Sequence, residues 1–107
     1  MADLFTPLVQ VVGTGAAATI YTPAVGESVI IKCIRIVNTS GSASDVTLYH
    51  DIDGSTYNAA SMIMGTFSLA GLATFTDVTA IIANSAGSIG MNAAATTTVT
   101  LYGDVVT

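Results

Sequence analysis

The run VIIKCIRIVN, residues 29–38, is the stretch that most strongly indicates the fold. It is rich in β-branched residues, which favour strands over helices. On both sides of it, short runs rich in Val, Ile, Thr and Tyr alternate with turn residues, and no long window has helical spacing. The sequence therefore predicts an all-β protein, a single antiparallel β-sandwich that is jelly-roll-like. The expected strands cover residues 8–12, 17–22, 29–38, 45–51, 61–69, 73–79, 87–93 and 97–106.

The run 29–38 does not alternate cleanly between apolar and polar residues. Each of its two alternating frames is mostly apolar, and each contains one of the two cations, Lys32 or Arg35. Two explanations remain open at this point: either a β-bulge switches the register, or both faces of the strand are covered. Because one sandwich covers only one face of each sheet, the second explanation predicts a partner subunit. On that hypothesis Val29, Ile31 and Val37, which share a frame, are candidate subunit contacts.

Two other runs alternate as expected for strands with one core face. In residues 45–51, Val46 and Leu48 are expected to face inward, and Thr47 and Tyr49 outward. The closing run, residues 97–106, alternates in the same way. One core of this kind fits 107 residues, so we expect one domain.

A short N-terminal arm, residues 1–7, is expected before the sandwich domain, residues 8–107. Leu4 and Phe5 are apolar and have little local structure to bury them, so they are further candidate subunit contacts. The arm could lie on a neighbouring subunit or fold back on its own sandwich, and the sequence leaves both alternatives open.

The composition narrows the possible partners. Charged residues make up 8% of the chain, with two cations and a net charge of −5, whereas ordinary soluble domains are about 25% charged. We therefore expect neither a nucleic-acid partner nor binding to an anionic membrane surface. Hydrophobic residues reach 51%, so partners are expected to bury part of the surface, although a surface of small uncharged residues remains the alternative. The single cysteine, Cys33, allows no internal disulfide and suggests a reducing compartment during folding.

No set of residues in the sequence predicts catalysis, a metal site or a cofactor. His50 is the only histidine, so one chain cannot build a histidine-based metal site. The segment DIDGS, residues 51–55, resembles the start of a calcium loop, but no acidic residue follows in 56–63 to complete it. An Asp-Gly hairpin turn is the favoured interpretation of this segment. We therefore expect that the protein is not an enzyme and that it binds neither a metal nor a cofactor.

Several segments together resemble a group of small β-sandwich virion proteins of tailed bacteriophages. They are YTPAVGE (21–27), IIKCIRIVNTSGSA (30–43) and VTLY (46–49), and the resemblance covers most of the chain. At residues 87–89 this chain has GSI where the group has an acidic residue after the glycine. The resemblance implies a structural component of the virion, made in the host cytoplasm and assembled onto the particle. It carries over no functional residue.

Within that group, the expected role is a capsid decoration or cement protein that docks on the major capsid protein. The alternatives are a tail or fibre component and, less favoured, a host-glycan-binding module. We expect a homo-oligomer, and a trimer would match the threefold points of an icosahedral shell. The trimer rests on this symmetry argument and on no residue of the chain.

Overall fold

The computed structural model describes residues 6–106, except for the side chains of Thr79 and Ala80. These residues form strands joined by loops, and the described part of the chain contains no helix that could cross a membrane. The eight strands are β1 (Thr6–Val12), β2 (Ala17–Tyr21), β3 (Ser28–Asn38), β4 (Ser44–Asp51), β5 (Met62–Leu69), β6 (Thr74–Asn84), β7 (Ser88–Asn92) and β8 (Thr97–Val106).

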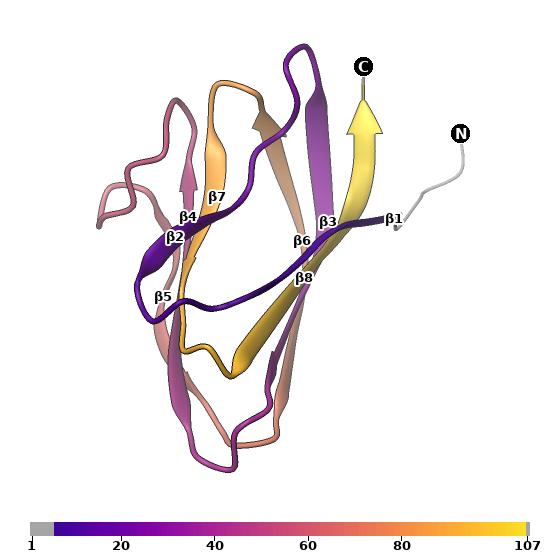
Figure 1. Cartoon of the computed structure of the whole chain (residues 1–107). Helices are drawn as coiled ribbons and strands as arrows, with labels where there is room; N and C mark the ends of the chain where they lie inside the picture. Colours follow the sequence, from indigo (N-terminus) through magenta and orange to yellow (C-terminus); the bar gives the residue numbers. More distant parts are fainter. Residues whose placement is uncertain (1–5, 107) are drawn as a thin grey trace.

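The strands form two four-stranded sheets that face each other (Figure 1). Their orders are β1-β8-β3-β6 and β2-β7-β4-β5, and all neighbouring strands are antiparallel. This order is that of an eight-stranded jelly roll built from two Greek keys. The predicted all-β class and the antiparallel sandwich are therefore confirmed.

The core lies between the two sheets, where alternate residues of both meet. Because successive strand residues point to opposite faces, each strand contributes every second side chain to this layer. The buried cluster contains Ile20, Val29, Ile31, Ile34, Ile36, Val46, Leu48, Leu69, Ile89, Met91, Ala93, Val99 and Leu101.

A β-bulge explains the irregular pattern of residues 29–38. In the pairing of β3 with both β6 and β8, the register shifts between Ile31 and Cys33. Val29 and Ile31 are buried before the shift, and Ile34 and Ile36 are buried after it. The bulge moves the inward-facing set from one frame to the other, so a single core accounts for most of the apolar residues in both frames.

This bulge corrects the candidate contacts on β3. Val29 and Ile31 are both 0% exposed within the chain's own core, so they cannot form a subunit contact in this fold. Val37 is half-buried and pairs with Thr74 and Thr98. The other two candidates, Leu4 and Phe5, lie outside the described residues.

Two strand boundaries also differ from the expectation. β1 begins at Thr6, which pairs with Gly103, so the last two residues of the expected arm belong to the sandwich. β6 does not end at residue 79 but continues to Asn84, opposite Ser28. The segment from Ile81 to Asn84 pairs with the first half of β3, so residues read as a connection are part of the sheet.

Asn38, the last residue of β3, ties together two connections at one end of the sandwich. Its side chain is fully buried, and its Nδ2 donates to the carbonyl oxygens of Ser42 (2.9 Å), Leu69 (3.0 Å) and Ala70 (3.3 Å). The amide of Ser40 donates to Asn38 Oδ1 at 3.0 Å. Both ends of the asparagine amide are therefore used to fix the β3–β4 and β5–β6 connections.

Candidate functional site

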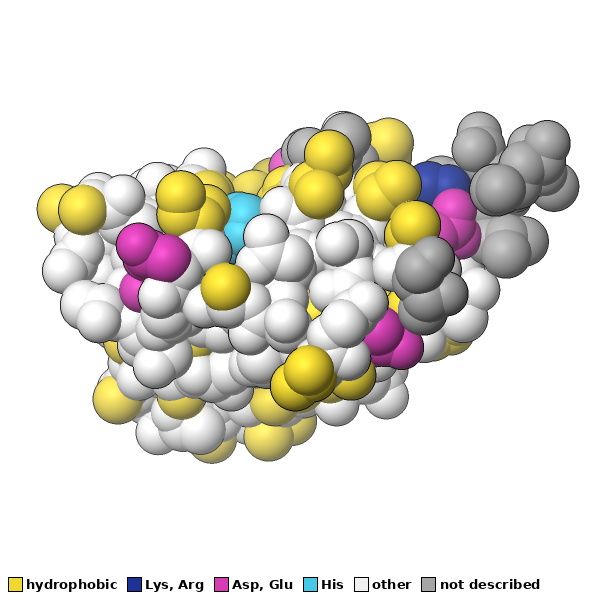
Figure 2. Space-filling view, turned by 90° about the horizontal axis from the view of Figure 1, so that it is seen from above, with side chains coloured by type: hydrophobic (Ala, Val, Ile, Leu, Met, Phe, Trp, Pro, Cys, Tyr) yellow, Lys and Arg dark blue, Asp and Glu magenta, His cyan; other side chains and the backbone are white. Residues whose placement is uncertain are grey.

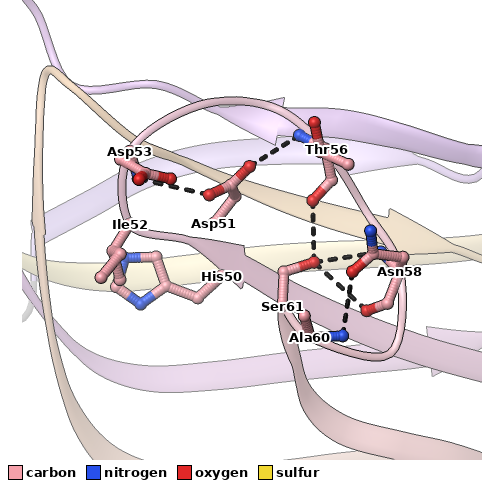
Figure 3. Close-up of a pocket in the computed structure, with 8 residues that line it drawn as sticks. All are labelled: His50, Asp51, Ile52, Asp53, Thr56, Asn58, Ala60 and Ser61. Atoms are coloured by element: carbon pink, nitrogen blue, oxygen red, sulfur yellow. Dashed lines mark hydrogen bonds between the residues drawn. The ribbon is translucent and has the colours of Figure 1, made fainter.

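The connection between β4 and β5, residues 52–61, lies at the end of the sandwich where β8 ends (Figure 1). Together with the end of β4, it forms a pocket (Figure 3). Its volume is about 300 Å³, at the low end of the range for ligand pockets. The lining residues all come from the end of β4 and the loop that follows. They are His50, Asp51, Ile52, Asp53, Thr56, Asn58, Ala60 and Ser61.

The carboxylate of Asp51 closes one half of this loop. Its oxygens accept hydrogen bonds from the backbone amides of Thr56 at 2.7 Å and Asp53 at 3.3 Å (Figure 3). These bonds favour the charged form, and the one from Thr56 contributes most to lowering the pKa of Asp51. The hydrogen bond with the Asp51 side chain and the repulsion between the two carboxylates raise the pKa of Asp53.

The Asp53-Gly54 turn differs from the expected tight hairpin. β4 and β5 do pair as a hairpin, but residues 52–61 separate them. The glycines with a positive φ are Gly15 and Gly26, so Gly54 does not use the backbone freedom on which the tight-turn interpretation rested. Within residues 6–106, no group of three His, Cys, Asp or Glu side chains is placed to hold a metal ion.

Ser61 and Asn58 close the other half of the loop. The hydroxyl of Ser61 donates to the carbonyl of Thr56 at 2.8 Å and accepts from the amide of Asn58 at 3.1 Å. The amide of Ala60 donates to Asn58 Oδ1 at 2.9 Å. The polar groups that line the pocket therefore mostly hold the loop in its own shape, and the Ser61 hydroxyl is directed to a carbonyl oxygen rather than to His50.

His50 contributes its backbone amide to the same arrangement by donating to the carbonyl of Ser61 at 2.7 Å. Burial lowers the pKa of its imidazole, and the charge of Asp51 partly opposes this effect. The lowered pKa favours the neutral form of the imidazole.

Tyr57, in the same loop, covers the outer face of the β2-β7-β4-β5 sheet. Its ring packs against that of Tyr49, with 5.6 Å between the ring centroids. Its hydroxyl lies 2.6 Å from Ser88 Oγ and 2.5 Å from Thr19 Oγ1. Ser88 Oγ donates to the carbonyl of Gly54 at 2.7 Å, so it accepts a hydrogen bond from the Tyr57 hydroxyl. The Tyr57 hydroxyl in turn accepts from Thr19 Oγ1.

The outer face of β4 is less exposed than the sequence predicts. Tyr49 and Thr47 were expected to face outward, and both are buried. Tyr49 lies under Tyr57, and the hydroxyl of Thr47 is 2.6 Å from that of Thr66 on β5. Sequence reasoning missed this layer. The available signals were Gly90 in the middle of β7, where a close approach is possible, and a tyrosine in the loop.

Charge is sparse on the surface of the sandwich. Lys32 on β3 and Asp104 on β8 form an ion pair, with 2.6 Å between Nζ and Oδ2, and both side chains are partly buried. Figure 2 shows the end of the molecule that is formed by the β2–β3, β4–β5 and β6–β7 connections. Small groups of apolar side chains lie there among mostly uncharged atoms, with few acidic or basic groups.

The exposed large apolar residues lie in connections, on the edge strands β1, β5 and β6, and at the end of β8. Val25, Ile52 and Leu72 are in connections, and Val78 and Ile82 are on the edge strand β6. The others are Val12, Met62, Ile63, Val105 and Val106. Comparison of the chain with protein-family models, with curated proteins and with solved structures found no match.

Proposed function

We propose that this protein is a non-enzymatic structural component of a virion, a capsid decoration or cement protein that docks on the major capsid protein and stabilises the shell. The observation that carries the proposal is a jelly-roll sandwich with a charge-poor surface, on which apolar side chains stand out on loops and edges. A surface of this kind favours association with other protein subunits over binding to charged ligands.

The energetics of docking support this role. Buried apolar surface contributes roughly 25 cal/mol per Å², and association has to overcome the entropy lost by the bound subunit. Val25, Ile52 and Leu72 present apolar groups that need no rearrangement of the core to become buried. Repetition of the same small contact around a symmetric shell multiplies its effect.

The proposed place of action is the virion, after assembly in the host cytoplasm. Cys33, the single cysteine, is free and buried in the sandwich. A fold without disulfides is compatible with folding in a reducing compartment. The protein is proposed to act as a homo-oligomer together with the capsid subunits.

A glycan-binding module is a second candidate, and the pocket of the 52–61 loop is the observation that favours it. The pocket combines carboxylate, amide and hydroxyl groups with the apolar side chain of Ile52. The engagement of Asp51, Asn58 and Ser61 in the loop's own hydrogen bonds reduces the number of groups left for a sugar. A glycan array with purified protein distinguishes the two functions, because specific glycan binding supports this second candidate.

The proposed cement function is tested by adding the purified protein back to particles that lack it. We expect the protein to bind the particles at a fixed ratio and to raise the temperature at which they release their nucleic acid. A variant with Val25→Lys, Ile52→Lys and Leu72→Lys should bind the particles more weakly, because the substitutions place charges at the proposed apolar contacts. Equal particle stability with and without bound protein would contradict the cement role.

A further inference from the structure

We propose that the free edge of β6 (Thr74–Asn84) binds the same edge of a second copy of this chain. The two strands would pair antiparallel about a twofold axis. This inference deepens the proposed function, because it rests on the self-association part of that proposal and assigns it to one surface. The argument comes from the four edge strands, the side chains of β6 and the size of the edge.

The four edge strands differ in how well they could accept another strand. β1 contains Pro7, which has no amide hydrogen to donate, and a register shift follows that residue. β2 has only five residues, and the pairing of β5 with β4 contains two register shifts within eight residues. Short length, proline and irregular pairing are the features by which proteins block their sheet edges.

β6 has fewer of these protective features. It has 11 residues with the sequence TFTDVTAIIAN, which contains no proline and no cation. It pairs with β3 on one side, and among the described strands it has no neighbour on the other. One register shift interrupts its pairing with β3, and regular segments lie on both sides of that shift.

The side chains of β6 are self-complementary. Val78 is 76% exposed and Ile82 is 69% exposed. Ile81 and Ala83, on either side of Ile82, point instead toward the core. Ile82 lies beside Ile30 of β3, which extends the apolar strip onto the sheet. A twofold axis midway between positions 78 and 82 places Val78 of one copy opposite Ile82 of the other. The two residues then form an apolar cross-strand pair on each side of the axis.

The single charge on β6 does not oppose this arrangement. With the axis at that position, Asp77 of each copy lies opposite Ala83 of the other. The two Asp77 carboxylates are then about 20 Å apart along the strands, beyond the distance at which exposed charges repel appreciably in physiological salt.

The edge is also large enough for a specific dimer. A strand of 11 residues is about 36 Å long, and the shortest dimension of the molecule is 17 Å. The side of the sandwich along β6 therefore has an area of about 600 Å², close to the 800 Å² or so that each partner buries in a standard interface. Backbone hydrogen bonds across the new strand pair would add to the apolar contacts.

The test uses charge substitutions at the two self-complementary positions. Together, Val78→Lys and Ile82→Lys place like charges opposite each other across the axis, whereas Val12→Lys adds the same charge to a residue that is 54% exposed at the end of β1, on the opposite edge of the sheet. In light scattering across a concentration series, we expect a monomer–dimer equilibrium for the natural chain. Val78→Lys with Ile82→Lys should weaken it at least tenfold, and Val12→Lys should leave it unchanged.

A crosslinking experiment tests the register. In a Cys33→Ala background, the double variant Val78→Cys with Ile82→Cys should form a covalent dimer on mild oxidation, because each new thiol faces the other across the axis. Either single variant should do so much less readily. Circular dichroism of each variant confirms that it remains folded.

The outcomes separate this inference from the proposed function. A dimer that tolerates both lysine substitutions, or a trimer, would overturn the β6 pairing and leave the self-association of the proposed function intact. A natural chain that stays monomeric at every concentration would overturn the β6 pairing together with the homo-oligomer. Binding to particles would then still test the cement role independently.

Discussion

The ring of Tyr57 lies directly on Gly90 in the middle of β7. A Cβ atom on residue 90 would come within 2.6 Å of the ring carbon Cε1. The glycine therefore makes room for a side chain that arrives from a loop more than thirty positions earlier in the chain. This contact joins the 52–61 loop, other residues of which line the pocket, to the outer face of the β2-β7-β4-β5 sheet.

Gly90→Ala should destabilise the protein by about 1–3 kcal/mol, because the added methyl group displaces the Tyr57 ring and its hydrogen bonds with Ser88 and Thr19. Chemical denaturation followed by circular dichroism measures this change. Gly41→Ala is the control, because a Cβ there meets no atom within 4 Å. In a Tyr57→Ala background, Gly90→Ala should cost far less. Additive effects of the two substitutions would show that the ring and the glycine act independently.

Asn38→Ala should lower the free energy of unfolding by about 2–4 kcal/mol, because the carbonyls of Ser42, Leu69 and Ala70 lose their buried donor. Asn38→Asp should be at least as harmful at neutral pH, because it replaces that donor with a charged acceptor among carbonyl oxygens. The exposed Asn92→Ala is the control. A loss no greater than that of the control would mean that Asn38 does not hold the two connections together.

Ile31→Val should destabilise the folded chain by about 0.5–1.5 kcal/mol and leave self-association unchanged, because Ile31 lies in the core and not on a contact surface. Denaturation measures the first effect and light scattering the second. A variant of normal stability that no longer self-associates would restore Ile31 as a subunit contact.

The melting temperature should fall as the pH is lowered from 7 towards 5. Burial lowers the pKa of His50 below its ordinary value of 6.5, so the unfolded chain binds a proton more readily than the folded one in this range. The stabilisation from neutral His50 is complete above pH 6.5 and decreases as the pH falls through that value and towards the lower folded-state pKa. His50→Gln should remove this part of the pH profile. An identical slope in the variant would assign the effect to other groups.

The fold could be predicted from the sequence wherever the local pattern and the final packing agree. β4 and β8 alternate, and β3 is long and β-branched, so their strand character follows from the sequence. The bulge between Ile31 and Cys33 was one of two explanations that the pattern allowed. Only the pairing with β6 and β8 decides between them, because register is a property of the neighbouring strands.

The candidate site was less predictable for a related reason. Asp51, Asp53 and Gly54 were recognised as turn residues, but Asp51 closes the loop through the amide of Thr56, five residues further on. The position of Tyr57 depends on contacts with β2 and β7, which are distant in sequence. Contacts of this kind leave only weak signals in the sequence, such as Gly90 and the loop tyrosine, and the local pattern therefore did not predict that the outer face of β4 is covered.

A cryo-electron microscopy map of the particle that contains this protein tests the central claim most directly. The account predicts density for the two four-stranded sheets on the outside of the shell, in contact with the major capsid protein and with a second copy across the β6 edge. Density for this sandwich found only in the tail or fibres, or its absence from the purified particle, would contradict the assignment as a capsid decoration protein.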